Sequence, residues 1–225
     1  MKKIFVYYIC LVFLISGGCA AVTTQKPTAE PSVLTVFVVR HAEAYQNLPF
    51  HSHMPKEKQD SLTPDGFMQA KKAGKYLKDK SIMAVVASPT GRTHQTARLI
   101  SEEVGLSGVF SENPAFKSMR KGKTPDGKPV TWSWRKAQWK AGHDPRPQGG
   151  ESLQDATDRA VQGVEILIKK YPGKSVVIVT HSDICASLAG HAKNTPFHQR
   201  YNKHGVGLGS VIEIHIGPQG TWKLK

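Results

Sequence analysis

Two short runs of apolar, largely β-branched residues restrict the fold of this chain most strongly. They are residues 36–39 (VFVV) and 176–180 (VVIVT). A strand that is apolar on both faces must be covered on both, as parallel strands are in α/β proteins. Further strand patterns at 82–87, 108–111 and 211–216 alternate with helical patterns. The sequence therefore predicts an α/β fold: a three-layer sandwich with a mostly parallel central sheet flanked by helices.

Basic side chains follow three of the expected strands. Arg40 and His41 come directly after the first run and His181 after the second, and Arg92 opens the helix that follows residues 82–87. Ligands of open α/β sheets bind beyond the carboxyl ends of the strands. Each histidine alone reads as an ordinary loop or helix-cap residue. A helix N-terminus and a guanidinium both favour a phosphoryl group, so the set predicts a phosphate-binding site at this edge.

A series of short motifs occurs along the chain: RHA (40–42), Asn47, LTPDG (62–66), SP with RT and QTA (88–97), GES (150–152) and THS (180–182). This ordered set resembles the histidine phosphatase superfamily, in its phosphoglycerate-mutase-like branch, and it extends from about residue 33 to residue 216. The resemblance implies a phosphoglycerate-mutase-like fold and a phosphohydrolase that needs neither a metal nor another cofactor.

The resemblance also assigns roles to site residues. His41 is the expected nucleophile, which forms a phosphohistidine that water then hydrolyses. Arg40, Arg92 and His181 are expected to hold the transferring oxygens, and Asn47 to contact the phosphate through its amide. Positive groups around three charged oxygens are what phosphoryl transfer mostly requires. The pair His51 and His53 is the one clustered alternative, but it lacks a nearby carboxylate or cysteine at metal-ligand spacing.

The general acid is where the chain departs from the family pattern. With Phe116 taken as the leucine-like position that precedes the usual glutamate, Ser118 stands in its place. Glu112 is the preferred alternative, Asp183 is another that also reads as a helix N-cap, and a missing acid is the third. A missing acid would favour leaving groups of low pKa, such as phosphate or imidazole, and a present acid would favour sugar or alkyl phosphomonoesters.

The N-terminus has the layout of a secretory signal. Lys2 and Lys3 precede an apolar stretch at 4–15, which is shorter than the roughly 20 residues of a spanning helix, and then SGGCA at 16–20. Cys19 after two glycines resembles a bacterial lipobox. We therefore expect a signal peptide at 1–18 and a lipidated Cys19 with a flexible tether at 19–33. The protein would be a membrane-anchored lipoprotein at the periplasmic face, or alternatively a secreted one.

The remaining residues, 34–225, are expected to form one histidine phosphatase domain with an insertion at 113–148. The insertion contains Trp132, Trp134 and Trp139, which either line the cleft or pack the insertion. With Cys10 in the signal peptide and Cys19 lipidated, Cys185 is the one free cysteine of the processed chain, and its apolar surroundings predict a buried, inert thiol.

The formal net charge of +14 favours anionic partners. We expect a phosphorylated small molecule or an envelope phosphate. Nucleic acid is not expected, because the lysines are scattered along helices and belong to no nucleic-acid-reading motif. Two alternatives remain: an envelope lipoprotein that binds phosphate or polyanions without catalysis, and a phosphotransferase of the phosphoglycerate mutase type. The expected export makes the mutase less favoured, since its usual substrates are cytoplasmic.

Overall fold

The computed structural model describes residues 33–217 and 219–225, so the predicted signal peptide and nearly all of the tether lie outside the described residues. Within them, no helix is long and apolar enough to cross a membrane. The elements, in chain order, are β1 (Leu34–Arg40), η1 (Tyr45–Asn47), η2 (His51–His53), α1 (Lys56–Gln59), α2 (Pro64–Leu77), β2 (Ile82–Ala87), α3 (Gly91–Glu103), β3 (Ser111–Glu112), η3 (Pro114–Phe116), α4 (Trp132–Lys140), α5 (Leu153–Lys170), β4 (Ser175–Thr180), α6 (Ser182–Ala192), α7 (Phe197–His204), β5 (Val211–Ile216) and β6 (Trp222–Leu224).

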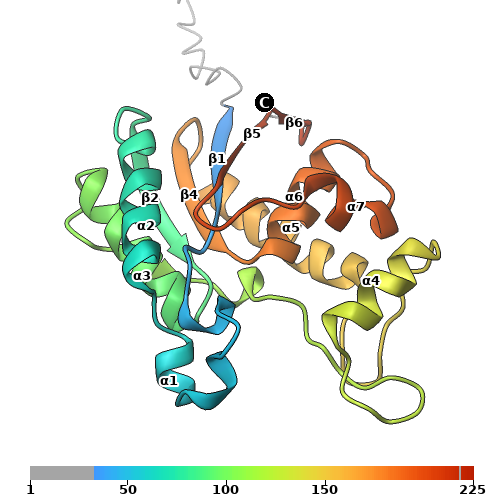
Figure 1. The fold of residues 1–225 in the computed structure, drawn as a ribbon. Coiled ribbons are helices and arrows are strands. Elements are labelled where there is room, and N and C mark those ends of the chain that lie inside the picture. Colours follow the sequence, from blue (N-terminus) through green and yellow to red (C-terminus); the bar gives the residue numbers. More distant parts are fainter. Residues whose placement is uncertain (1–32, 218) are drawn as a thin grey trace, which may run out of the picture. The chain divides into compact units, whose positions relative to one another are not determined.

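The strands form one mixed sheet in the order β3-β2-β4-β1-β5-β6 (Figure 1). β3, β2, β4 and β1 are parallel to one another, whereas β5 pairs antiparallel with β1 and β6 antiparallel with β5. The prediction of an α/β fold with a mostly parallel sheet is confirmed. In the register of β1 and β4, Arg40 lies opposite Thr180, so the residues that follow both strands emerge at the same edge.

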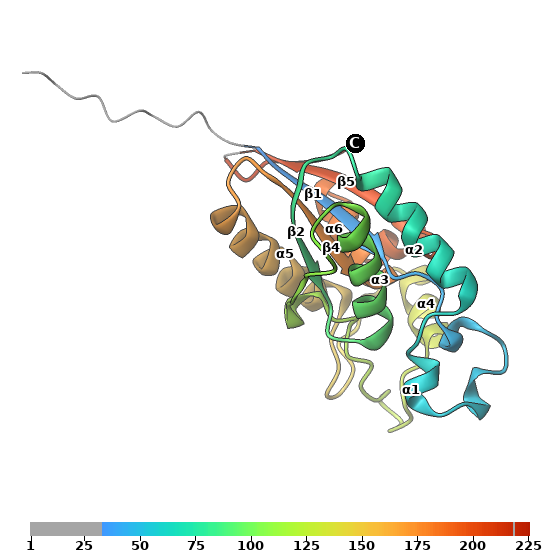
Figure 2. The same cartoon turned by 90° about the vertical axis from the view of Figure 1, so that its left-hand side faces the viewer.

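Alternate residues of the strands bury the two faces of the sheet against different helices. Val36 and Ile178 belong to a core cluster with side chains of α5 and α6, while Phe37 and Val177 belong to a second cluster with side chains of α2 and α3. Figure 1 shows α2 and α3 on one side of the strands and α5 and α6 on the other, and Figure 2 shows the molecule from the side of α2 and α3. The predicted three-layer sandwich is therefore present, and burial on both faces explains the uninterrupted apolar strands.

Side-chain caps start the helices beside the site. Thr63 caps α2 by accepting a hydrogen bond of 3.0 Å from the backbone N–H of Gly66, and Ser152 caps α5 in the same way. These caps satisfy backbone groups that have no partner within the helix. The interpretation of Asp183 as an N-cap is wrong, because His181 occupies that position and Asp183 lies inside the first turn of α6.

Gly66 allows the start of α2 to pack closely against the loop that follows His41. A Cβ atom at this position would lie 2.0 Å from the carbonyl oxygen of Glu43. That same oxygen accepts a 3.0 Å hydrogen bond from the backbone N–H of Thr63, and the Thr63 hydroxyl donates to the Glu43 carboxylate at 2.7 Å. The LTPDG motif thus holds the loop after β1 in place.

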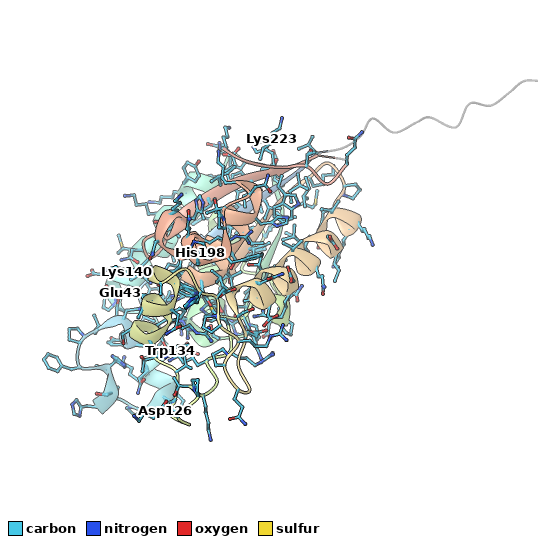
Figure 3. The ribbon with its side chains drawn as sticks, turned by 90° about the vertical axis from the view of Figure 1, so that its right-hand side faces the viewer. Glu43, Asp126, Trp134, Lys140, His198 and Lys223 are labelled. Carbon is cyan, nitrogen blue, oxygen red and sulfur yellow. The ribbon has the colours of Figure 1, made fainter. Side chains whose placement is uncertain are left out.

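The segment after β1 and the predicted insertion both carry short helices. Residues 44–61 contain η1, η2 and α1, and the predicted insertion contains η3 and α4. Figure 3 shows the side chains of this region, with Asp126 in the loop before α4 and with Trp134 and Lys140 on α4 itself. β6 was not predicted from the sequence, since its few residues alternate too briefly to be recognised.

Candidate active site

The structure brings the basic residues of three strand ends into one cavity of about 570 Å³. His41 follows β1, His181 follows β4, and Arg92 lies in the first turn of α3 after β2. These strands are neighbours and parallel, so their carboxyl ends meet at one edge of the sheet. Arg40 and Asn47 also line this cavity. The site therefore forms where parallel-sheet geometry places ligand sites.

The His41 side chain is held in its neutral form. Its side chain is buried, and Nδ1 lies 2.8 Å from the carbonyl oxygen of Ala42. Because a carbonyl oxygen can only accept, Nδ1 carries the proton and Nε2 keeps its lone pair. Burial and the positive charge of Arg92 lower the pKa of His41 to about 3. The ring is thus unprotonated at neutral pH and able to attack phosphorus.

His181 is also held neutral. Its Nδ1 lies 3.1 Å from Nη2 of Arg92, a group that can only donate, and its Nε2 lies 2.8 Å from the Ser88 hydroxyl. Burial, followed by the charge of Arg92, lowers its pKa well below the usual value. The centroids of the His41 and His181 rings are 5.5 Å apart. In the free site His181 is therefore a neutral group that fixes Arg92.

Asp60 contacts Arg92, which sequence reasoning missed. Its carboxylate pairs with the guanidinium and accepts a hydrogen bond of 2.6 Å from the backbone N–H of Gly91. The N-terminus of α3, predicted to attract a substrate anion, is thus partly satisfied by a carboxylate of the chain itself. No local pattern indicates this contact, because Asp60 lies 32 residues before Arg92.

Arg40 and Asn47 are each tied to the backbone on one side. Nη1 of Arg40 donates to the Val206 carbonyl at 2.7 Å, and the Asn47 side-chain oxygen accepts from the Ala44 N–H at 2.9 Å. The Asn47 oxygen is therefore occupied, and its amide N–H₂ is the part left to donate. This geometry matches the amide contact that the family resemblance implies for this residue.

The two acid candidates lie in different places. Glu112 is exposed on β3, 3.1 Å from Nε2 of His94, and is not among the residues that line the cavity. Asp183 lines the cavity but is fully buried, and its Oδ2 accepts from the Ser118 hydroxyl at 2.8 Å and from the Met119 N–H at 2.7 Å. Burial raises the pKa of Asp183. The structure therefore brings Asp183, and not Glu112, to the site.

The three tryptophans of the predicted insertion differ in location. Trp139 is buried in the core. Trp132 and Trp134 are both half-buried, and of these two only Trp132 lines the cavity. The ring of Trp132 stacks on Tyr201 of α7, with centroids 5.6 Å apart. Tyr201 also lines the cavity, and the sequence offered no signal for it because it comes from a helix far along the chain.

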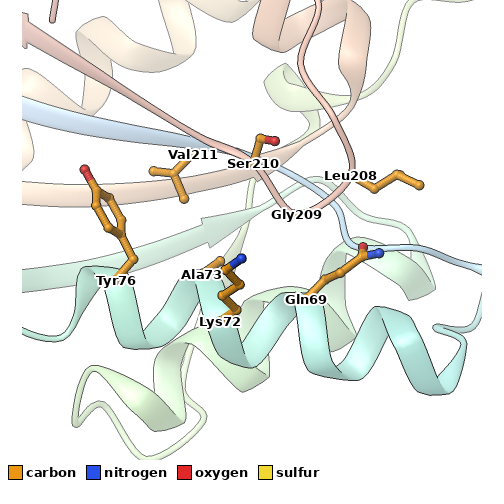
Figure 4. A pocket seen from close by; sticks show the side chains of 8 residues that line it. All are labelled: Gln69, Lys72, Ala73, Tyr76, Leu208, Gly209, Ser210 and Val211. Atoms are coloured by element: carbon orange, nitrogen blue, oxygen red, sulfur yellow. The ribbon is translucent and has the colours of Figure 1, made fainter.

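A second cavity of about 460 Å³ lies between α2 and the segment that leads into β5. Figure 4 shows Gln69, Lys72 and Tyr76 of α2 on one side of this cavity, with Leu208 near Gln69 and Val211 near Tyr76 on the other. It contains no histidine or arginine, so it lacks the groups that phosphoryl transfer needs. The described residues contain no group of three or more His, Cys, Asp or Glu that could hold a metal ion.

The single described cysteine, Cys185, is a buried residue of α6. Its side chain belongs to the core cluster that α5 and α6 share, and it forms no disulfide. Burial raises the pKa of this thiol, which keeps it protonated at neutral pH. A protonated, inaccessible thiol is a poor nucleophile. These surroundings agree with the prediction of an inert cysteine.

The two buried histidines are expected to make the fold sensitive to acid. Below pH ~6.5 the unfolded chain protonates His41 and His181, which the folded state cannot do until the pH approaches their lowered pKa values. The free energy of unfolding should therefore fall as the pH decreases from about 7 towards 4, by up to about 1.4 kcal/mol per pH unit for each histidine. Urea unfolding across this range measures the slope.

The control for this prediction is the double variant His41→Gln with His181→Gln, which removes both groups and leaves the carboxylates unchanged. Its free energy of unfolding should depend less steeply on pH than that of the wild type. Equal slopes in the two proteins would show that other groups determine the acid sensitivity.

Comparison with known proteins agrees with this site. A model of the histidine phosphatase superfamily (branch 1) matches residues 36–225. A protein of Erwinia tasmaniensis described as a probable phosphoglycerate mutase GpmB is 29% identical over 154 residues, which are 66% of this chain and 70% of that protein. The family model spans the residues of the cavity, and the predicted family membership is confirmed.

Solved structures show the same fold. The mycobacterial glucosyl-3-phosphoglycerate phosphatase in complex with VO₃ superposes with a TM-score of 0.66 at 22% identity, covering 85% of this chain and 97% of that one. A phosphoserine phosphatase of Entamoeba histolytica superposes with a TM-score of 0.66 at 19% identity, covering 85% and 95%. Since the family model accounts for almost the whole described domain, the chain belongs to branch 1 of the histidine phosphatase superfamily, the phosphoglycerate-mutase-like enzymes.

Proposed function

We propose that this enzyme is a metal-independent phosphatase that hydrolyses phosphomonoesters through a phosphohistidine on His41. The observation that carries the proposal is the state of His41: a buried, neutral imidazole whose Nδ1 is bound to the Ala42 carbonyl and whose Nε2 is free in a cavity lined by Arg40 and Arg92. A neutral nucleophile beside two guanidinium groups suits attack on a phosphate dianion.

The reaction would proceed in two displacements. In the first, Nε2 of His41 bonds to phosphorus while the bond to the leaving oxygen breaks, and the alcohol departs with one proton. In the second, water bonds to phosphorus as the bond to Nε2 breaks, one proton of the water returns to the acid, inorganic phosphate leaves, and His41 returns to its neutral form. Arg40 and Arg92 stabilise the charge on the three equatorial oxygens in both steps. Substrate binding would bring a dianion next to His181, which favours its protonated form.

The proton for the leaving oxygen would come from Asp183 by way of Ser118. The Ser118 hydroxyl lies between the cavity and the buried carboxyl group, at 2.8 Å from Oδ2. Burial favours the protonated form of Asp183. A protonated Asp183 can donate to the oxygen of Ser118, which then passes its own proton to the leaving group. Asp183 would thus act through Ser118 and not by direct contact with the substrate.

Asp183→Asn tests this proton path, because the asparagine side chain has nearly the same shape as that of aspartic acid but has no acidic proton to donate. We expect kcat/KM for a primary alkyl phosphate to fall by about 10²-fold, since an alkoxide is a poor leaving group. For p-nitrophenyl phosphate, whose leaving group needs little protonation, the fall should be below about threefold. Steady-state kinetics on both substrates give the ratio of the two losses in kcat/KM. Equal losses on both would mean that Asp183 only supports the fold, and Glu112→Gln is the matched control that should keep the wild-type ratio.

Trapping the intermediate tests the proposed function itself. The full chain is mixed with ³²P-labelled phenyl phosphate in the presence of EDTA and quenched in alkali, because phosphohistidine is labile in acid. We expect turnover that EDTA does not reduce and label on the peptide that contains His41. Loss of turnover with EDTA, or label on no histidine, would contradict the proposal. Retention of phosphate without any turnover would favour the non-catalytic binding protein.

A phosphotransferase is the second candidate function, and the similarity to the probable phosphoglycerate mutase of Erwinia tasmaniensis favours it. The same labelled enzyme distinguishes the two reactions. If phosphoglycerate accepts the label from the protein faster than water does, the enzyme is a mutase; if the label appears mainly as inorganic phosphate, it is a phosphatase.

We also propose that the enzyme is a lipoprotein anchored through Cys19 and acting on phosphates outside the cytoplasm. The signal-like sequence around Cys19 supports this, and that segment lies outside the described residues. Labelling of producing cells with radioactive palmitate should mark the wild-type chain and leave Cys19→Ala unmarked. A soluble, unlabelled wild-type protein in the external medium would favour the secreted form.

A further inference from the structure

One wall of the active-site cavity is built from residues that the proposed chemistry does not use. Trp132 and Lys136 come from α4, Tyr201 from α7, and Lys121 from the loop before α4. Figure 1 shows α4 and α7 as neighbours, and their aromatic rings stack directly. We call these four residues the α4 wall.

The α4 wall is anchored to the core. The ring of Tyr201 stacks on the buried Trp139 at 5.2 Å between centroids, and the Trp139 indole N–H donates to Asp144 at 3.1 Å. Arg135, which is 2% exposed, donates to the carbonyl oxygen of Lys121 at 3.0 Å. The positions of Trp132 and of the Lys121 backbone are therefore set by packing and hydrogen bonds beneath them, as in a preformed site.

The lysines of the α4 wall have no carboxylate partner among the described residues, and Nζ of Lys136 lies 5.8 Å from the centroid of the Tyr201 ring. Within the described part of the chain, neither Lys121 nor Lys136 forms an ion pair, whereas Lys128 of the same region pairs with Asp126. The carboxyl group that lines this cavity, Asp183, is buried behind Ser118. Lys121 and Lys136 line the same cavity as Arg40 and Arg92. The cavity therefore carries more positive charge than the binding of one phosphate requires.

We propose that the α4 wall is a second subsite, which binds the leaving-group half of the substrate and selects leaving groups that carry a second anionic group. Lys121 and Lys136 bind this second anion, a carboxylate or a phosphate, and the faces of Trp132 and Tyr201 contact the carbon frame that joins the two anions. The inference deepens the proposed function and rests on it. The cavity volume of about 570 Å³ accommodates a molecule larger than phosphate alone.

Matched aryl substrates test the subsite, because their leaving groups differ mainly in charge. The substrates are phenyl phosphate, 3-carboxyphenyl phosphate and 1,3-phenylene bisphosphate. For the wild type we expect kcat/KM to be at least about 10-fold higher for the two doubly anionic substrates than for phenyl phosphate, chiefly through a lower KM. The double variant Lys121→Ala with Lys136→Ala should reduce this preference to about one. The doubly anionic substrate whose kcat/KM falls more in the double variant carries the favoured second anion.

Lys140→Ala is the matched control, since Lys140 lies on α4 but does not line the cavity (Figure 3). It should keep the wild-type preference. A wild type that hydrolyses phenyl phosphate but shows no preference would overturn the subsite and leave the proposed function intact. If no substrate is turned over, the proposed function fails, and isothermal titration of 1,3-phenylene bisphosphate against phenyl phosphate still decides the subsite: equal affinities in wild type and double lysine variant would overturn it.

Discussion

His41→Ala is expected to lower kcat for p-nitrophenyl phosphate by about 10⁴- to 10⁶-fold, the range seen when a residue of the bond-forming machinery is removed. The reason is specific to this residue. Nε2 of His41 has a free lone pair, Nδ1 is bound to the Ala42 carbonyl, and the lowered pKa keeps the ring neutral. In the proposed mechanism Arg40 and Arg92 bind phosphate, but a guanidinium holds no lone pair that could replace that of His41. Steady-state hydrolysis of p-nitrophenyl phosphate, measured with EDTA present, gives kcat for the variant and for the wild type.

The control for this variant is His53→Ala, which changes an exposed histidine that does not line the cavity. Its kcat should stay within about twofold of the wild type. Near-ultraviolet circular dichroism should show that His41→Ala keeps its tertiary packing. A folded His41→Ala protein that retained more than about a tenth of the wild-type kcat would rule out His41 as the nucleophile.

Arg92→Lys is expected to lower kcat/KM by about 10²- to 10³-fold, although it preserves the charge. The guanidinium makes two directed contacts at once, with Asp60 through Nη1 and with His181 through Nη2. A lysine ammonium has no planar fork and cannot reproduce both contacts while it faces the phosphate. The loss should appear mainly in kcat, because the contact with the transferring oxygens strengthens in the transition state.

The matched control is Arg98→Lys, an exposed arginine of the same helix α3. This change should leave kcat/KM within about twofold of the wild type. Asp60→Asn removes the charge of the other partner in the ion pair between Arg92 and Asp60. If Arg92→Lys behaved like Arg98→Lys, charge alone would suffice at this position and the directed geometry would have no catalytic value.

The parts of the fold that local patterns encode were predicted well. The runs at 36–39 and 176–180 became β1 and β4, and the caps Thr63 and Ser152 are of the residue types that commonly begin helices. The antiparallel direction of β5 was not predicted, since strand direction depends on pairing with β1 and not on the residues of β5. The bounds of the 113–148 insertion and of the tether remain predictions.

The residues of the candidate site also fall into two groups, those that local sequence patterns predicted and those that they did not. Arg40, His41, Arg92 and His181 were found from the sequence because each one follows a strand or opens a helix at the ligand-binding edge. The preferred acid, Glu112, was chosen by its closeness in sequence to the expected position. The structure places it on an exposed strand beside His94 instead.

The sequence by itself determined the layers of the fold, the edge of the sheet that carries the chemistry and the residues expected to perform it, because periodicity, caps and strand ends are local properties. Only the tertiary structure decided that Asp60 holds Arg92, that Asp183 lies behind Ser118 and that Tyr201 stacks on Trp132. Each of these contacts joins segments far apart in the chain. Their partners are selected by packing and by the exclusion of water, which no local pattern records.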